Sequence, residues 1–429
     1  METVFNEQNA YRLLKQLSFP RLGGSSEEKR AADMLRKYLK SVGLNPREET
    51  FQIQAYQDIH ASVEVLSPYR KRYNVSVMGN SGSTPDKGVR SEVVYLNSFS
   101  PEHINAARNK VAMVYQGNIS KTMFLRLRQN NVKALIRIYE ATPQLPQLKQ
   151  GDLFLKAFGK IPSVFISYED GLEMIQKGAK TINIISKQKE FKATSRNVVA
   201  EIKGTDLPNE KIYIVGHYDS VNKVDGCVDN AGGSVTIAEF ARYFAQHPPK
   251  RTIVFVWFGS EEMGLKGSWA YTEKHKKELA KPKPPVMLNT PQVKLLINVD
   301  VAGTVMGNNG SVICGTEQMA TFVDSFAKEK GIPFQTGHSA YSSDNIPFNE
   351  KGIPSIALHR YSGNYGHTPL DNMRLMSPAG LKILGQFGLE LVSRIVNSVD
   401  MPFDLSIPEA DKKATHEYIE RANPFYVKK

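Results

Sequence analysis

Residues 254–264 read VFVWFGSEEMG, an apolar run that ends in two adjacent carboxylates, Glu261 and Glu262. A strand without polar alternation is typical of a sheet that is covered on both faces. Three similar runs occur in the same half of the chain: KIYIV at 211–215, KLLINV at 294–299 and PSIALH at 354–359. Helical stretches such as SVTIAEFARYFAQ separate these runs. The sequence therefore predicts an α/β domain whose mixed, mostly parallel sheet carries helices on both faces.

Two helices are marked clearly by their ends. Residues 25–43 place Ser25 and Glu28 at the spacing of a capping box, carry one apolar face, and stop at Gly43. The run from Ser377 to Val399 begins with Ser-Pro, which is typical of the first position of a helix. We expect the second of these helices to close the main domain.

The middle of the chain has a different pattern. Strand-like alternation at residues 51–66 and 73–78 leads into KVAMVYQG, helical KTMFLRLRQNN, strand-like ALIRIY and IPSVFISYEDG. This pattern predicts a small α/β module of residues 62–190, inserted into a main domain of residues 1–61 and 191–429. The proline-rich KPKPP at 281–285 is predicted to be a connecting loop.

Composition narrows the class of protein. The 429 residues carry 55 basic and 43 acidic side chains, a net charge of +12, but the basic residues are scattered, so we expect no nucleic-acid partner. The two cysteines, Cys227 and Cys314, form no disulfide or zinc framework. No apolar run has the length of a signal peptide or a membrane span. We therefore expect a cytoplasmic protein with no membrane partner, or a secreted one if a leader has been removed. The oligomeric state stays open.

Side chains that bind metals follow each of the four apolar strands. His217 and Asp219 follow the first, the glutamate pair the second, Asp300 the third, and a loop after the fourth leads to His367. Asp229 lies in CVDNAGG, twelve residues after His217. In open α/β sheets, ligands bind outside the carboxyl ends of the strands. We therefore expect these side chains to meet in one site.

Each of these residues also has a simple structural explanation. Asp229 can be a helix cap, His217 a buried histidine with a hydrogen-bond partner, and the two glutamates a solvated surface. These explanations do not account for ligand-type side chains at all four strand ends.

Histidines and carboxylates together favour zinc, with manganese or cobalt as alternatives. Five candidate ligands fit two ions better than one, and Asp229 can bridge ions at the separation of roughly 3.5–4 Å that is typical of two-metal sites. Adjacent glutamates cannot reach one ion from the same direction. One of Glu261 and Glu262 is therefore expected to ligate, while the other takes a proton from the attacking water as general base.

At these residues the chain resembles the M28 family of zinc metallopeptidases, a group with two co-catalytic metals. The matching stretches are GHYDSV, DGCVDNAGGSVTIAEFAR, VFVWFGSEEMGLKGSWAY, LINVDVAG, SSDNIPF with GIPSIAL, and GHTPLDN, in the family's order between residues 195 and 400. The resemblance implies one zinc ion on His217 and Asp300 and another on Glu262 and His367. It further implies that Asp229 bridges them and that Glu261 is the general base.

The resemblance also implies supporting residues. Asp219 would hold the ring of His217, and Asp371 would either hold that of His367 or cap a turn. Apart from the resemblance, a tetrahedral intermediate needs a group that stabilises its oxyanion, and Tyr365, two residues before His367, is the candidate, with Tyr361 and Tyr341 behind it.

The chain departs from the family's pattern at two positions. Cys227 stands where a small residue such as alanine is usual, and Asn345 stands where a histidine is expected. His338 and His359 have no comparable placement and are assigned structural roles.

The insertion resembles a protease-associated domain, which can cover an active-site cleft. As a whole, the resemblance implies a metallo-aminopeptidase that hydrolyses N-terminal residues of peptide substrates through a dinuclear zinc site. Alternatives are a carboxypeptidase or dipeptidase of the same family, a glutaminyl-cyclase-like transferase with one metal, and a binding homologue without catalysis.

Overall fold

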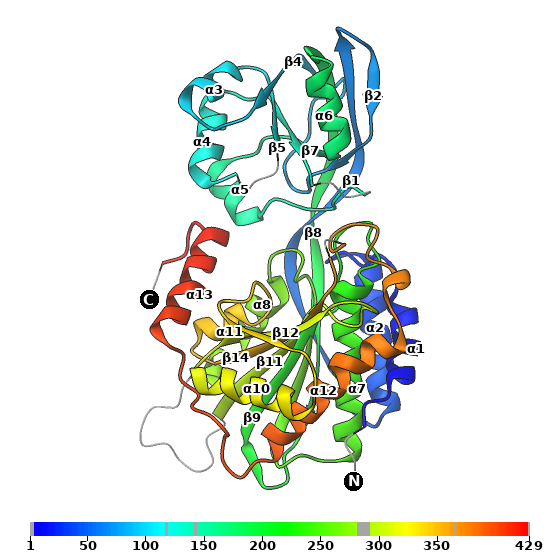
Figure 1. Ribbon diagram of the computed structural model, residues 1–429, viewed down its shortest axis with the longest axis vertical. Helices are drawn as coiled ribbons and strands as arrows, with labels where there is room; N and C mark the ends of the chain where they lie inside the picture. The colour runs from blue at the N-terminus through cyan, green and yellow to red at the C-terminus, as the bar shows by residue number, and fades with distance from the viewer. Residues whose placement is uncertain (1–3, 116–118, 141–143, 281–291, 364, 428–429) are drawn as a thin grey trace.

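The computed structural model describes residues 4–115, 119–140, 144–280, 292–363 and 365–427. The chain forms a large lobe and a smaller lobe, one above the other in Figure 1. Two long antiparallel strands, β1 (Arg47–Ser67) and β8 (Thr181–Ile202), run through both lobes. The KPKPP loop expected at 281–285 lies outside the described residues.

The sheet of the large lobe contains the four apolar strands predicted from the sequence. They are β9 (Leu207–His217), β10 (Arg251–Phe258), β11 (Gln292–Val299) and β14 (Ser355–Tyr361). These strands lie in the order β14-β11-β9-β10 and are parallel to one another. Strand β8 pairs antiparallel with β10 at one side, and β12 (Asn308–Cys314) pairs antiparallel with β14 at the other, followed by β13 (Gln335–His338). The predicted mixed, mostly parallel sheet is confirmed.

Helices cover both faces of this sheet, as expected. Along β10, Ile253, Phe255 and Trp257 enter one core, and the alternate residues enter another. The first core includes α1 (Glu7–Leu17), α2 (Ser26–Ser41), α7 (Gly233–Gln246), α10 (Glu317–Glu329) and α12 (Pro378–Asn397). The second includes α8 (Lys266–Lys274), α9 (Lys276–Leu279) and α11 (Ile346–Glu350).

The predicted helix ends are also present. Ser25 Oγ accepts a hydrogen bond from the backbone N–H of Glu28 at the start of α2, and Gly43 follows that helix with a φ of 87°. Ser377 caps α12 in the same way. Two short irregular segments, η1 (Cys227–Gly232) and η2 (Met373–Leu375), lie near the carboxyl edge of the sheet.

The sheet continues into the small lobe through β8. Its strands β4 (Val89–Leu96), β5 (Val111–Tyr115), β6 (Ala134–Ile138), β7 (Ser163–Ile166) and β3 (Val75–Val77) lie in that order, and β2 (Lys71–Tyr73) pairs with β1. The helices of this lobe are α3 (Pro101–Ala106), α4 (Lys121–Gln129), α5 (Asp152–Phe158) and α6 (Tyr168–Gln176). The boundaries expected at residues 61 and 191 fall inside β1 and β8, which stay paired between the lobes.

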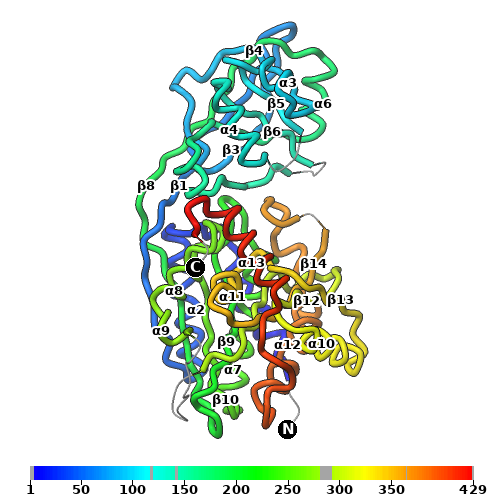
Figure 2. Tube along the Cα trace, turned by 90° about the vertical axis from the view of Figure 1, so that its left-hand side faces the viewer, coloured from blue at the N-terminus to red at the C-terminus, as the bar shows by residue number. Residues whose placement is uncertain are grey.

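A further helix, α13 (Glu409–Ala422), was not predicted. It runs along the large lobe towards the junction of the two lobes (Figures 1 and 2). Beyond it, the ammonium group of Lys156 in the small lobe lies 5.7 Å from the ring centre of Phe425. Among the described residues, no helix is long and apolar enough to cross a membrane.

Candidate metal centre

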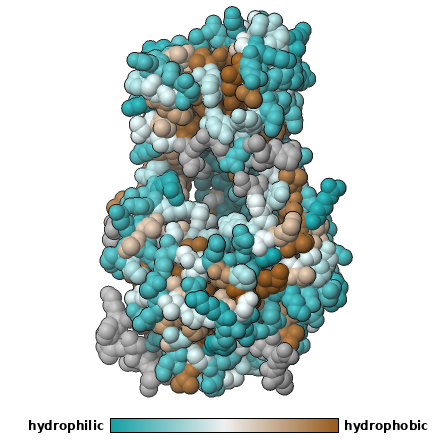
Figure 3. All heavy atoms as spheres, viewed as in Figure 1, coloured by the Kyte–Doolittle hydropathy of each residue, from teal (hydrophilic) through white to brown (hydrophobic). Residues whose placement is uncertain are grey.

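A pocket lies where the two lobes meet, and the molecular surface is hollowed there (Figure 3). The large lobe lines it with residues that follow the carboxyl ends of β9, β10 and β11. The small lobe contributes Gln147, Leu148 and Lys149 from the segment between β6 and α5. An adjoining hollow shares Asp229 and His367 with this pocket.

The five candidate ligands meet in this pocket. Nε2 of His217 lies 3.1 Å from one carboxylate oxygen of Asp229 and 3.2 Å from Oδ1 of Asp300. The other oxygen of Asp229 lies 3.2 Å from Nε2 of His367, which lies 3.4 Å from Oε2 of Glu262. Two groups of potential ligand atoms result, and Asp229 belongs to both.

The donor set fits zinc. Each group offers one imidazole nitrogen and two carboxylates, and ligand atoms within each group lie within 4.8 Å of one another. Among the described residues, the ion pairs of these carboxylates run only to the two histidines. Oε1 of Glu262 is buried without a hydrogen-bond partner. Buried carboxylates that lack enough partners are strongly favourable surroundings for a cation.

The charges of this pocket act on the two histidines. The charge of Glu262 holds the pKa of His367 well above 6.5. Burial lowers the pKa of His217, but the carboxylates of Glu261 and Asp300 outweigh it and hold that pKa well above 6.5. The pocket thus favours positive charge at the position that both histidines face.

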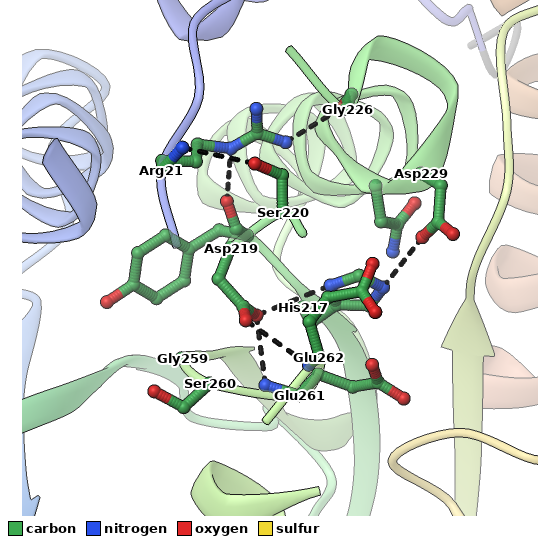
Figure 4. Close-up of polar contacts among 12 residues, drawn as sticks. Arg21, His217, Asp219, Ser220, Gly226, Asp229, Gly259, Ser260, Glu261 and Glu262 are labelled. Atoms are coloured by element: carbon green, nitrogen blue, oxygen red, sulfur yellow. Dashed lines mark hydrogen bonds and ion pairs between the residues drawn. The ribbon is translucent and has the colours of Figure 1, made fainter. Parts of the chain in front are cut away.

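The glutamate pair is held by Asp219. The two oxygens of the Asp219 carboxylate accept the backbone N–H groups of Glu261 and Glu262, at 3.0 and 3.2 Å (Figure 4). Oδ1 of Asp219 also lies 3.4 Å from Nδ1 of His217, where the sequence placed it. Asp219 therefore positions three residues of the site rather than one.

Glu261 differs from its neighbour, because it belongs to neither group of ligand atoms. It lines the same pocket. Burial raises the pKa of its carboxyl group well above 4.5, and the charges of Glu262 and Asp344 raise it further, against the influence of His217. A buried carboxylate with raised proton affinity beside a metal centre is suited to accept and return a proton.

Asp371 does not bond to His367. Its two oxygens accept the backbone N–H groups of Val228 and Asp229, at 2.7 and 3.0 Å. The prediction that it holds the His367 ring is wrong, because its carboxylate is occupied by the loop that carries Asp229. Burial raises the pKa of Asp371 to about 7.

Asp229 is not a helix cap, so that structural alternative is also wrong. Helix α7 begins at Gly233, and the N–H of Gly233 donates a hydrogen bond to Oδ1 of Asn230 at 3.0 Å. The same oxygen accepts the N–H of Val301 at 3.2 Å. The side chain of Asp229 is left free to face the two histidines.

Arg21 was not predicted to belong to the site. This arginine is fully buried, and its guanidinium donates to the carbonyl oxygens of Tyr218 and Asp225. It also donates to the carbonyl oxygen of Gly226, at 2.7 Å (Figure 4). It ties the segment after β9 to the loop that precedes Asp229. Nothing in the spacing around Arg21 distinguishes it from a solvated arginine. Asp344, fully buried near Glu261, and Lys149 in the pocket wall were also missed.

The three tyrosines lie in two places. Tyr341 and Tyr361 line the pocket of the five candidate ligands, and their hydroxyl oxygens are 3.3 Å apart. Tyr365 lines the adjoining hollow beside His367. The role of Tyr365 in oxyanion stabilisation stays a prediction.

The remaining residues named from the sequence have local partners. Cys227 is buried with its sulfur 3.1 Å from Oγ of Ser18, and burial raises the pKa of its thiol to about 12. The amide of Asn345 donates to the carbonyl of Tyr341 at 3.2 Å. Cys314 is buried and free, His338 pairs with Glu317, and the ring of His359 stacks 6.0 Å from that of Tyr341.

Comparisons with known proteins find similarity to peptidases. Residues 197–392 match the model of peptidase family M28. The chain is 25% identical to aminopeptidase YwaD of Bacillus subtilis, over 94% of this chain and 87% of that protein. It is 24% identical to human carboxypeptidase Q, over 85% and 79% of the two chains.

Solved structures show the same fold. The zinc aminopeptidase BSAP from Bacillus subtilis superposes with a TM-score of 0.75 at 22% identity, covering 95% of this chain and 99% of that one. The aminopeptidase from Aneurinibacillus sp. strain AM-1 gives 0.71 at 22% identity, covering 95% and 97%. The matched segment 197–392 carries all five candidate ligands and Glu261. Residues 197–392 of this chain thus resemble peptidase family M28.

Proposed function

We propose that this protein is a zinc-dependent aminopeptidase that removes N-terminal residues from peptides. The observation that carries the proposal is the pair of candidate ligand groups that share Asp229. Glu261 lies in the same pocket and belongs to neither group. The names of two relatives, aminopeptidase YwaD and the zinc aminopeptidase BSAP, support the same activity.

The proposed site holds two zinc ions. His217 and Asp300 would hold one, Glu262 and His367 the other, and Asp229 would contact both, because its two oxygens face different histidines. Bound zinc would supply Lewis acidity, which polarises the scissile carbonyl and makes water easier to deprotonate.

The protein's own residues would then move the proton. Glu261 accepts a proton from the attacking water and returns it to the amine that leaves, so its raised pKa suits both halves of the transfer. Asp219 keeps the Glu261 backbone in place through its hydrogen bond. For the developing oxyanion, Tyr365 is the residue expected from the sequence, and Tyr361 is the alternative that shares the pocket with the ligands.

The small lobe would act as a roof over this pocket, in the manner of a protease-associated domain. The backbone N–H of Gln147 donates to the carbonyl of His367 at 2.8 Å, which joins the roof to the metal centre. A pocket closed from above accepts the end of a peptide more readily than its middle. This arrangement supports an exopeptidase.

The test is hydrolysis of aminoacyl-anilides, with a free or an N-acetylated amine, by zinc-loaded wild type and by Glu261→Gln. We expect cleavage of the free-amine substrates only, and a loss of about 10²–10⁴-fold in kcat for the variant with its zinc retained. Glu262→Gln is the matched control, because it should lose zinc as well as activity. Full activity of Glu261→Gln with zinc bound would contradict the assignment of the base.

A carboxypeptidase or dipeptidase is the second candidate. The similarity to carboxypeptidase Q supports it. Cleavage of N-acetylated peptides from their C-terminal end, with no cleavage of the anilides, would replace the proposed function with this one.

A further inference from the structure

Lys149 brings a positive charge from the small lobe into the pocket of the proposed metal centre. It lines the same pocket as Glu261 and Glu262 and is only partly exposed. No resemblance or motif in the sequence pointed to this residue, because it lies in the inserted lobe.

The backbone around Lys149 is held on both sides. The N–H of Gly79 donates to the carbonyl of Leu148 at 3.0 Å, and the N–H of Gln150 donates to the carbonyl of Gly79 at 2.8 Å. Gly79 and Lys149 form an isolated parallel bridge. Together with the bond from Gln147 to His367, these contacts fix the segment over the metal centre. The position of Lys149 is thus built into the fold.

The ammonium group of Lys149 does not neutralise a neighbouring carboxylate through an ion pair. Within the part of the chain that the structure describes, no carboxylate lies within 4.0 Å of Nζ of Lys149 as an ion pair, and this nitrogen has no hydrogen bond to the protein. By contrast, the nearby Lys266 is paired with Asp152 at 2.8 Å. Burial, and then the charge of Lys266, lower the pKa of Lys149 to about 8, so its amine is largely protonated at pH 7. A partly buried ammonium without a partner is costly unless a ligand supplies the missing anion.

We propose that Lys149 is a specificity-determining residue that binds a carboxylate of the substrate on the leaving-group side of the scissile bond. The inference rests on the proposed peptidase function. The ammonium of Lys149 would repel the free N-terminal amine of a substrate, which leaves the other side of the scissile bond for it to contact. In a dipeptide, the carbon of the C-terminal carboxylate is two bonds from the scissile nitrogen, roughly 2.5 Å away.

Two sources of carboxylate fit this chemistry: the C-terminus of a dipeptide and an acidic side chain after the scissile bond. Ala-Ala and its C-terminal amide separate the first source. Ala-Asp-amide and Ala-Asn-amide separate the second. In all four the N-terminal residue is the same, so differences in kcat/KM report the leaving-group side alone.

The variants are Lys149→Met, which keeps the length of the side chain without the charge, and Lys149→Arg, which keeps the charge. Lys266→Met is the matched control, because it removes a neighbouring positive charge that is already paired. We expect wild type to favour a carboxylate substrate over its neutral partner by about tenfold or more in kcat/KM, mainly through KM. Lys149→Met should lose this preference and keep its rate on the neutral substrates, Lys149→Arg should retain most of it, and Lys266→Met should retain it.

Three results would overturn the proposal: no preference in wild type, an unchanged preference in Lys149→Met, or an equal loss of preference in Lys266→Met. Binding of the same four peptides to zinc-loaded Glu261→Gln, with and without Lys149→Met, is measured by calorimetry. This second measurement does not need turnover. Carboxylate-selective binding that depends on Lys149 would therefore support the inference even if the peptidase assay failed, and its absence would overturn it.

Discussion

Glu28 offers a sharp test of the electrostatics beneath the site. Its carboxylate is fully buried and accepts hydrogen bonds from the N–H of Gly24 at 2.8 Å and from the hydroxyls of Ser195 and Ser260, at 2.6 and 3.1 Å. Ser260 directly precedes the glutamate pair. Burial, and then the charge of Asp219, raise the pKa of Glu28 to about 8. We predict that Glu28→Gln makes the protein's stability less dependent on pH.

The sign and size follow from the pKa shift. Glu28 holds its proton in the folded chain up to about pH 8, whereas in the unfolded chain it releases the proton near the usual 4.5. The contribution of protonated Glu28 to the free energy of unfolding is therefore fully present below pH 4.5 and is lost as the pH rises towards 8. Between pH 5 and pH 8.5 this loss is about 4 kcal/mol in the free energy of unfolding. Glutamine cannot ionise, and the serine hydroxyls can accept from its amide, so the variant should escape the loss.

The assay is urea unfolding at pH 5, 7 and 8.5, followed by tryptophan fluorescence. We expect the stability of Glu28→Gln relative to wild type to rise by about 4 kcal/mol across this range. Glu27→Gln is the control, because Glu27 is exposed on the same turn and should follow wild type. A constant difference between Glu28→Gln and wild type at all three pH values would refute the reasoning, because it would mean that Glu28 is ionised in the folded chain.

Two further predictions concern the metal centre. Asp219→Asn keeps the shape of the side chain but leaves only one oxygen for the two N–H groups of Glu261 and Glu262, so zinc affinity should fall about 10–100-fold with the fold intact. Competition with a chromophoric chelator measures this affinity, and an affinity equal to that of wild type would contradict the role of Asp219. Adding a chelator to the zinc-loaded protein should lower its Tm, because zinc present at 100 times its Kd stabilises the folded state by about 2.7 kcal/mol. Calorimetric scans test this, and a Tm that does not respond to the chelator would speak against a metal centre.

The central strands and the meeting of the ligands could be predicted because the relevant signals are local. Each of the four strands is an uninterrupted apolar run, and each is followed by a side chain of a type that binds metals. The parallel order of the strands then places these positions at one edge of the sheet. Nothing beyond strand direction was needed to bring His217 and Asp300 within 3.2 Å of each other.

The supporting contacts could not be predicted, because they join distant segments through the backbone. Arg21 bonds to the carbonyl of Tyr218, 197 positions away. A backbone carbonyl has no signature in the sequence, so Arg21 reads like any surface arginine. Asp371, four residues after His367, was expected either to hold the His367 ring or to cap a turn. The backbone of His367 has a left-handed φ of 58°, however, and Asp371 bonds to the Asp229 loop instead.

The two paired strands that connect the lobes limit how substrates of the proposed peptidase would enter the pocket. A flexible linker would let the small lobe open and close over the pocket. Strands β1 and β8, however, stay paired from Arg47 and Val199 to Ser67 and Thr181, with irregularities after Asp58 and after Val65. Lifting the small lobe would have to bend this two-stranded ribbon and also break the bond from Gln147 to His367 and the ion pair of Lys266 with Asp152. We therefore expect the small lobe to stay in place over the pocket, so that the charge of Lys149 would act on every substrate of the proposed peptidase.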